Sequence, residues 1–198
     1  VEVTAAPIID EFRAVTTDDF RLPGAGRDIP QSVTIIPDAL MRSEGATTLR
    51  DVLRNQPGMV FSAGEGGQYG DNFTVRGFSG RNDIFLDSTR DLGQYRRDVF
   101  NLDAVEVLKG PSSMIFGRGS SGAVVNQISK KPIMQDYGMV SGSVGTDDYW
   151  RGTADLNKKV SDNAAFRLNL MGEYSESSRE SVWDRRWGVA PAVTLRLN

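Results

Sequence analysis

The sequence predicts an α+β domain with a mixed sheet and short helices, followed by a series of antiparallel β-hairpins. Three observations lead to this prediction. Residues 28–132 alternate short strand patterns with short helix signals. Within them, Val105–Pro132 holds two strand patterns on either side of a helical turn and a glycine cluster. Beyond Pro132, apolar and polar residues alternate over long stretches, as the two faces of a β-strand require.

Composition excludes several classes of function. The chain has 198 residues and a net charge of −3, which favours neither disorder nor a nucleic-acid partner. It contains no cysteine and no histidine, so disulfides, thiolate sites, Ser-His-Asp triads and histidine zinc sites are excluded. No apolar run is long enough for a transmembrane helix.

The first part begins with a tail and linker over residues 1–27, which show no sustained periodicity. A capping box follows further on, because Thr48 and Asp51 can each accept a hydrogen bond from the other's backbone amide. Leu49, Val52 and Leu53 form the apolar stripe of the helix that this box begins. Other helix signals cover Pro37–Glu44 and Ser112–Phe116, and strand patterns cover Ser32–Ile36, Met59–Phe61, Phe73–Gly77, Ile84–Asp87, Ala104–Lys109 and Ala123–Ser129.

Two loops of this part carry candidate binding residues. Ala63–Asp71 is rich in glycine but lacks the lysine and hydroxyl residue of a phosphate-binding loop. Ser88–Asp98 concentrates three arginines with one tyrosine. One interpretation is a solvated loop whose aspartates, Asp87, Asp91 and Asp98, neutralise the arginines. The other is a site for an anionic, aromatic ligand, because guanidinium groups bind oxyanions in bidentate fashion and stack on aromatic rings.

One segment matches the sequence of a dinucleotide-binding motif but lacks the structural context that the motif requires. Gly117–Gly122 reads GRGSSG and matches G-x-G-x-x-G. That fingerprint requires a helix after the glycines and an acidic residue about 20 positions further on. The residues that follow, AVVNQIS, are β-branched and alternate, so they predict a strand. We therefore reject a nucleotide-dependent enzyme and assign the glycines to tight packing and turns.

The last part, residues 133–198, contains four alternating stretches: Gly138–Val144, Trp150–Val160, Ala165–Tyr174 and Trp187–Leu197. Their lengths suit tilted membrane strands of about 9–11 residues. A short connector, Ser161–Asn163, and a long polar one, Ser175–Asp184, are typical of outer-membrane barrels, as are aromatic residues near strand ends. An ordinary antiparallel sheet with one wet face is the alternative. Four strands cannot close a barrel, so the barrel interpretation expects an incomplete one.

Several motifs, in the same order, resemble the plug domain of TonB-dependent outer-membrane siderophore receptors. They are DIPQSVTII (Asp28–Ile36), LRDVLRNQPGMVF (Leu49–Phe61), TVRGFSGRNDIFLD (Thr74–Asp87) and the whole of Val105–Pro132. Arg90–Asp103 is most similar to the catecholate-type ferric siderophore receptors. The later hairpins resemble the first strands of the family's barrel, with Lys130-Lys131-Pro132 as the hinge between the two parts.

The resemblance implies a bacterial outer-membrane receptor that imports a ferric siderophore by an energy-coupled rearrangement of its plug. It implies two further partners, the TonB energy-coupling protein and outer-membrane lipid. TonB would pair with an N-terminal box, which VEVTA resembles, comprising Val1, Glu2, Val3, Thr4 and Ala5. The siderophore would contact the outward loops of the plug, at Gln68, Tyr69, Arg81, Arg90, Gln94, Tyr95, Arg96 and Arg97.

A ferric catecholate needs cations and aromatic rings from its receptor rather than metal ligands, because its iron is already fully coordinated. This accords with a chain that lacks histidine and cysteine. Because no bond is made or broken, the resemblance implies no catalytic residues, no metal-ligating residues and no cofactor. Two alternatives stay open. The first is a receptor of the same family for another cargo, such as a hydroxamate siderophore, haem or a vitamin. The second is a soluble, β-rich binding module.

Overall fold

A computed structural model describes Phe12 and residues 31–62, 70–117, 122–146, 148–176 and 182–196. The chain forms two compact units, Val1–Ser129 and Lys130–Asn198. The sequence patterns place this boundary slightly later, after Pro132. No helix in the described ranges is long and apolar enough to cross a membrane.

The first unit is built on a mixed sheet, as the sequence predicts, and this sheet has five strands. β5 and β8 run parallel, whereas every other neighbouring pair is antiparallel. β8 follows directly after Gly122, so a strand stands where a dinucleotide site would need a helix. The strands, in their order across the sheet, are β1 (Ser32–Pro37), β7 (Leu102–Lys109), β8 (Ala123–Ser129), β5 (Ile84–Leu86) and β6 (Thr89–Arg90).

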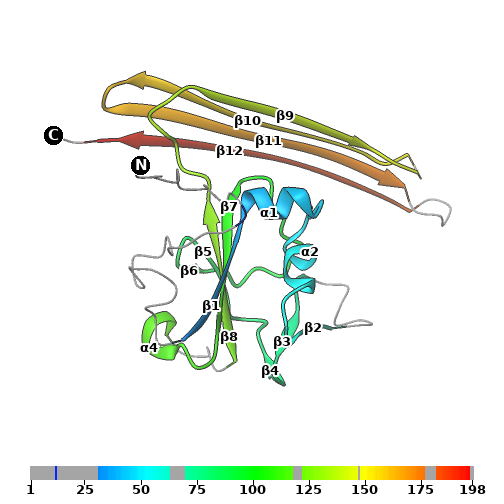
Figure 1. The fold of residues 1–198 in the computed structure, drawn as a ribbon. Helices are drawn as coiled ribbons and strands as arrows, with labels where there is room; N and C mark the ends of the chain where they lie inside the picture. The colour runs from blue at the N-terminus through cyan, green and yellow to red at the C-terminus, as the bar shows by residue number, and fades with distance from the viewer. Residues whose placement is uncertain are drawn as a thin grey trace, which may run out of the picture. The chain divides into compact units, whose positions relative to one another are not determined.

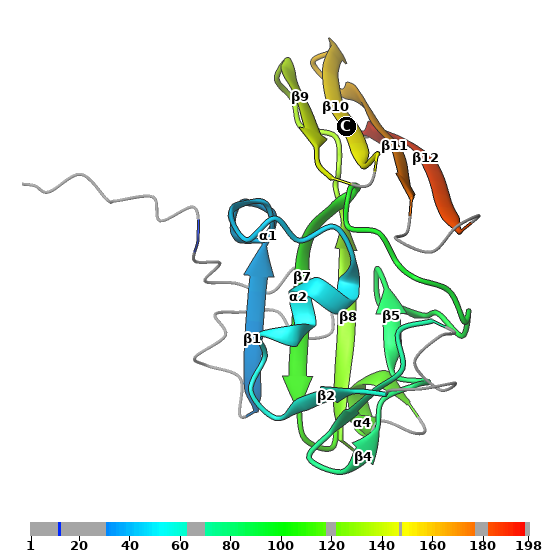
Figure 2. The same cartoon turned by 90° about the vertical axis from the view of Figure 1, so that its right-hand side faces the viewer.

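Short helices and a small second sheet complete this unit. Figures 1 and 2 show α1, α2 and β2 on one side of β7 and β8. The second sheet is antiparallel, in the order β2-β3-β4. The elements are α1 (Asp38–Ser43), α2 (Leu49–Arg54), α4 (Ser113–Phe116), β2 (Met59–Phe61), β3 (Phe73–Val75) and β4 (Phe78–Ser79).

The core lies on both faces of the five-stranded sheet because its central strands alternate between them. Val105 and Val107 of β7 join the larger apolar cluster, which includes the predicted stripe of α2. Leu108 of β7 joins a smaller cluster with Phe116 of α4. The predicted capping box is also present: the Thr48 hydroxyl accepts from the Asp51 amide at 3.3 Å, and the Asp51 carboxylate accepts from the Thr48 amide at 3.0 Å.

The second unit is a four-stranded antiparallel sheet in the order β12-β11-β10-β9. Its strands are β9 (Tyr137–Val144), β10 (Trp150–Ser161), β11 (Ala164–Glu176) and β12 (Trp183–Leu195). The connector predicted over Ser175–Asp184 is longer than the observed one, because residues at both of its ends belong to strands. Glu176 pairs with Trp183, so both strands extend into a segment whose charged residues hide the alternation.

The two faces of this sheet have opposite chemistry. Figure 2 shows the four strands side by side. The polar face is buried and includes Arg151, Asp155, Asn157, Arg167, Asn169 and Glu173. The apolar face is exposed and includes Trp150, Leu156, Phe166, Trp187, Val189, Val193 and Leu195. The predicted division of the strands into an apolar and a polar side is confirmed for these residues.

Candidate functional site

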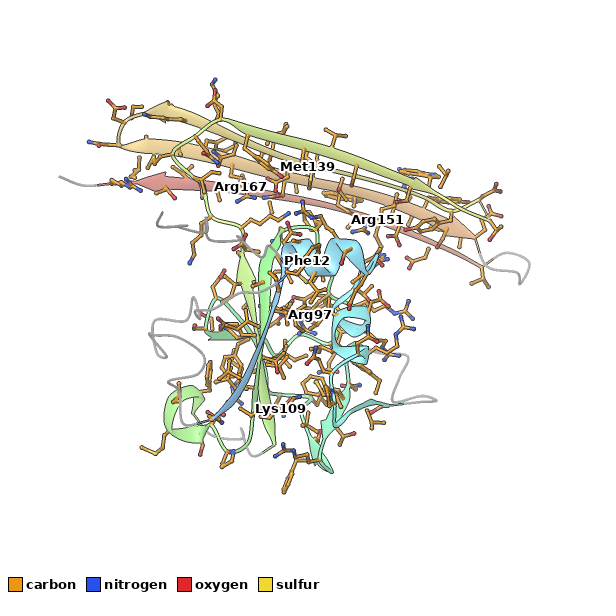
Figure 3. The ribbon with its side chains drawn as sticks, in the orientation of Figure 1. Phe12, Arg97, Lys109, Met139, Arg151 and Arg167 are labelled. Carbon is orange, nitrogen blue, oxygen red and sulfur yellow. The ribbon has the colours of Figure 1, made fainter. Side chains whose placement is uncertain are left out.

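The loop between β6 and β7 is wrapped around the side chain of Arg97. This guanidinium donates five hydrogen bonds, which use all of its N–H groups. Two go to the carboxylates of Asp91, at 3.0 Å, and Asp71, at 3.4 Å. Three go to backbone carbonyls, of Gly93 at 2.8 Å, Tyr95 at 3.3 Å and Asp91 at 3.4 Å. Arg97, which is labelled in Figure 3, is only 3% exposed.

Asp91 holds the beginning and the tip of this loop together. Its carboxylate accepts from the Tyr95 hydroxyl at 2.7 Å and from the Gly93 amide at 3.0 Å, besides Arg97. Burial acts to raise the pKa of Asp91, but these hydrogen bonds outweigh it and lower the pKa below its usual value. The loop is therefore tied by a carboxylate that is ionised at neutral pH.

Asp71 ties the same guanidinium to the end of the glycine-rich segment. One oxygen accepts from both the backbone amide and the side chain of Arg97, at 3.0 and 3.4 Å. The other oxygen, Oδ1, has no hydrogen-bond partner in the described part of the chain. Burial consequently outweighs the contacts with Arg97 and raises the pKa of Asp71. The two aspartates thus differ in the strength of their support for the loop.

Tyr95 lies against Arg97 at the tip of the loop. The guanidinium carbon is 4.4 Å from the centroid of the tyrosine ring, which is a cation–π distance. Gly70, with φ +72°, packs beneath this tip, since a Cβ there would lie 3.1 Å from the Tyr95 backbone nitrogen. Burial and the hydrogen bond to Asp91 raise the pKa of the Tyr95 hydroxyl, so the ring stays neutral.

The outward side of the loop carries residues of the kind that the sequence singles out. Gln94, Tyr95 and Arg96 are exposed, and the exposed fraction of Tyr95 is 50%. Arg96 makes no hydrogen bond or ion pair within the described residues. Arg96 and Arg97 are adjacent in the sequence but have opposite environments. One is available to a ligand, whereas the other is enclosed by its own loop.

The remaining predicted site residues lie elsewhere. Arg90 donates to the Phe116 carbonyl at 3.2 Å, lies 5.1 Å from the centroid of the Phe85 ring and approaches Asp83 at 3.9 Å. Arg81 is exposed in the turn between β4 and β5. Gln68, Tyr69 and the segment Val1–Ala5 lie outside the described residues.

Only one of the three aspartates proposed to neutralise the arginine loop contacts Arg97. Asp91 does so directly. Asp87 instead accepts from the Ser129 amide at 2.9 Å, and Asp98 accepts from the Phe100 amide at 3.0 Å. The sequence patterns do not single out Asp71, which is separated from Arg97 by 26 positions. The sequence signal that could have pointed to Asp71 was its position after Gly70, at the end of the glycine-rich loop.

In the second unit, the segment after β8 is fastened to the polar face of the sheet. Asp155 accepts two hydrogen bonds from Arg167, at 2.7 and 2.8 Å, and pairs with Lys130 at 3.1 Å. Arg167 also donates to the Lys131 carbonyl at 2.9 Å. The Asn157 amide donates to the Ile133 carbonyl at 2.8 Å. The predicted hinge at Lys130–Pro132 is thus held through both side chains and backbone. Figure 3 shows Arg151 and Arg167 on this sheet.

Taken together, the first unit offers a basic and aromatic loop that is held by hydrogen bonds. Such a surface can bind an anion that contains aromatic rings through charge and stacking. Among the described residues, no group of three or more acidic side chains is arranged to hold a metal ion.

Comparison with known proteins connects this arrangement to one family. Residues 25–124 match the family model of the TonB-dependent receptor plug domain. The catecholate siderophore receptor Fiu of Escherichia coli K12 is 41% identical over 175 residues. The probable TonB-dependent receptor BfrD of Bordetella pertussis is 39% identical over 174 residues. Each alignment covers 86% of this chain and 23% of the relative, so the chain spans about a quarter of their length.

Solved structures agree with the sequence relatives. The crystal structure of the siderophore receptor PiuA from Acinetobacter baumannii superposes with a TM-score of 0.87 at 33% identity, covering 93% of this chain and 27% of that one. The closed form of the ferric-catecholate import receptor Fiu from E. coli K12 gives a TM-score of 0.86 at 38% identity, with the same coverages. Both the mixed-sheet unit and the antiparallel strands therefore have counterparts in these receptors.

Proposed function

Because this chain belongs to the TonB-dependent receptor family, we propose that it forms the plug and part of the barrel wall of a receptor that imports a ferric siderophore. The ligand class that we propose is a ferric catecholate. The observation that carries this proposal is the exposed group of Gln94, Tyr95 and Arg96 on a loop locked from inside by Arg97. Relatives named as catecholate receptors support it.

The chemistry of the loop suits this ligand. A ferric tris-catecholate is an anion with three aromatic rings, and its iron needs no ligand from the protein. Arg96 supplies a cation without an ion-pair partner among the described residues, and Tyr95 supplies an exposed aromatic surface. Arg81 and the side chains of Gln68 and Tyr69 are proposed as further contacts. No bond of the ligand has to be formed or broken, so we propose a transporter rather than an enzyme.

We further propose that the protein resides in the bacterial outer membrane. The exposed apolar face of β10–β12 suits contact with lipid acyl chains. The opposite face of these strands is buried and polar, and its charged side chains form ion pairs. Energy would come from TonB, which would pair with residues Val1–Ala5 by strand addition. Transport would then be a rearrangement of the plug that opens a path for the bound complex.

Ligand titration tests the cargo. The intact receptor is titrated with a ferric tris-catecholate and with a ferric trihydroxamate, at low and high salt. We expect tighter binding of the catecholate, and we expect Arg96→Gln to weaken it about tenfold while reducing its salt dependence. Leu92→Gln, an uncharged change on the same loop, is the control for the charge effect. Preference for the trihydroxamate would favour another cargo within the same family.

Deletion of residues 1–5 tests the energy coupling separately. Cells that express the shortened receptor should bind the ferric catecholate with unchanged affinity but should lose uptake of iron from it. This separation is expected because the deleted segment would contact TonB and not the ligand. Full uptake after the deletion would place the TonB contact elsewhere.

A further inference from the structure

We propose that Arg97 is a positioning residue, which locks the ligand-facing loop and prepares the ring of Tyr95 to receive an electron-rich aromatic anion. This inference rests on the proposed function, because it assigns a role within the same binding loop. It departs from the prediction that all the arginines of this loop contact the ligand directly.

The hydrogen bonds of Arg97 leave it no donor for a ligand. All five N–H groups are already used by acceptors between Asp71 and Tyr95, and the side chain is 3% exposed. Three of these acceptors are backbone carbonyls of the loop itself. Ligand contact would require breaking this network. Arg97 therefore acts through the shape that it imposes on residues 91–97.

Lysine cannot replace Arg97 in this role. Its ammonium group has three donors on a single nitrogen, whereas the guanidinium spreads five donors over a planar fork. The acceptors of Arg97 lie on different sides of that fork: Asp91 at Nε, Asp71 at Nη1 and Gly93 at Nη2. A lysine would keep the positive charge but would leave loop carbonyls without partners.

The second step concerns the ring of Tyr95. A cation near one part of an aromatic ring draws the π electrons toward itself. The guanidinium carbon lies 4.4 Å from the ring centroid, while half of the side chain is exposed. The exposed part of the ring is consequently less negative than in a free tyrosine. Such a ring stacks more favourably on an electron-rich catecholate, because the quadrupoles of the two rings then repel less.

The orientation of Tyr95 is also fixed. Its hydroxyl donates to Asp91 at 2.7 Å, and Asp91 in turn accepts from Arg97 at 3.0 Å. A Cβ on Gly93 would lie only 2.6 Å from the ring, so the backbone packs directly against it. The Tyr95 ring, the Asp91 carboxylate and the Arg97 guanidinium thus each contact the other two. The ligand meets a ring that is already placed, which reduces the entropy lost on binding.

Adjacent arginines provide a matched test of the lock. Arg96→Lys and Arg97→Lys are compared in the intact receptor by the rate of trypsin cleavage within residues 91–98. Both variants keep two basic cleavage sites. We expect about a tenfold faster cleavage for Arg97→Lys and no more than about a twofold change for Arg96→Lys, because only the first opens the loop. Equal cleavage rates in the two variants would overturn the locking role.

Binding measurements test the action through Tyr95. We expect Arg97→Lys and Tyr95→Leu each to weaken ferric tris-catecholate binding about tenfold, and the double variant to be no weaker than either single one. Tyr95→Phe, which keeps the ring, should retain most of the affinity. Additive losses in the double variant would show that Arg97 does not act through this ring.

The two measurements separate this inference from the proposed function. If the unchanged receptor does not bind the ferric tris-catecholate, the proposed function and the role of Tyr95 are both wrong. The cleavage contrast between Arg96→Lys and Arg97→Lys still decides whether Arg97 locks the loop. Binding by the unchanged receptor, with no loss in Arg97→Lys, would leave the proposed function standing and overturn the inference.

Discussion

Strand β7 of the plug and strand β11 of the second unit both alternate, but they bury opposite chemistry. In β7, both faces are buried: Val105 and Val107 lie in the larger apolar cluster, and Leu108 lies in the smaller cluster on the other face. In β11, Arg167, Asn169 and Glu173 are buried, while Phe166 on the other face is 36% exposed. Alternation therefore identifies the two faces of a strand but not which of them is interior. That choice depends on whether water or lipid lies outside.

The difference predicts different sources of stability. The core around β7 is stabilised mainly by apolar burial, so its weak points are cavities, although the plug also buries a few charges, such as the Arg97–Asp71 pair. The second unit buries charges, and these are tolerated only because each has partners. Asp155, for instance, serves both Arg167 and Lys130. Removing one member of such a group costs more than the group contributes, since the others are left buried without a counter-charge.

The largest expected effect follows from removing Asp155. Asp155→Ala leaves the side chains of Arg167 and Lys130 buried without their carboxylate, and should lower the free energy of unfolding by about 3–5 kcal/mol. Urea unfolding of the intact receptor in lipid measures this. Lys158→Ala is the control, because its pair with Asp136 is exposed and should contribute at most about 1 kcal/mol. Equal losses in the two variants would contradict the burial argument.

A cavity in the plug is the corresponding test of the first unit. Leu53 of α2 has no exposed surface and belongs to the larger apolar cluster. Leu53→Ala should lower the stability of the plug by about 2–5 kcal/mol, through lost burial and the cavity left behind. Hydrogen exchange of α2 and β7 in the intact receptor reports it. A loss confined to α2 would mean that the cluster does not act as one core.

Two exposed valines sharpen the comparison between the units. Val189 of β12 is 56% exposed and Val60 of β2 is 66% exposed. If the outward face of β12 contacts lipid, Val189→Arg should destabilise the receptor by about 2–4 kcal/mol, since residue 189 lies in the middle of its strand. Val60→Arg, on the plug, should stay within about 0.5 kcal/mol. Similar small effects in both variants would contradict a lipid contact at β12.

Much of the fold was predictable because its determinants are local. The capping box at Thr48 and Asp51 needs residues three positions apart, and the strand after Gly122 is visible from its own composition. The sides of β10 and β11 follow from alternation alone. The strand ends at Glu176 and Trp183 were missed because pairing between strands, rather than either sequence segment, extends them.

The site was less predictable because its decisive contacts are distant in the sequence. Arg96 and Arg97 look equivalent in the chain, and only the folded loop distinguishes them. Asp71 and the carbonyl of Gly93 meet at Arg97 through tertiary structure. A cluster of arginines predicts a basic loop, but it cannot show which guanidinium is fully hydrogen-bonded within the protein and which is exposed to a ligand.

The smallest predicted effect concerns pH and the two aspartates that share Arg97. Asp91 has a lowered pKa, so it stabilises the loop above its unfolded-state pKa of about 3.9, and this stability is lost as the pH falls through its folded pKa. Asp71 has a raised pKa. Its contribution is fully present below about pH 3.9 and is lost as the pH rises through its folded pKa. The two dependences therefore oppose each other.

Substitution of each aspartate should expose the pH dependence of the other. With Asp71→Asn, protection of residues 91–97 from hydrogen exchange should increase relative to the unchanged receptor at pH values above the folded pKa of Asp71, because the substitution removes a carboxylate whose charged form is disfavoured by burial. With Asp91→Asn, protection should be lower throughout and should fall further as the pH rises through the raised folded pKa of Asp71. Rates are compared as the ratio of variant to unchanged protein at each pH, which cancels the intrinsic pH dependence of exchange. We expect effects of a few-fold, which is less than the tenfold change that about 1.4 kcal/mol produces. Faster exchange of Asp71→Asn at pH values above the folded pKa of Asp71 would mean that its contacts with Arg97 outweigh its burial, and that both carboxylates are needed to hold the loop.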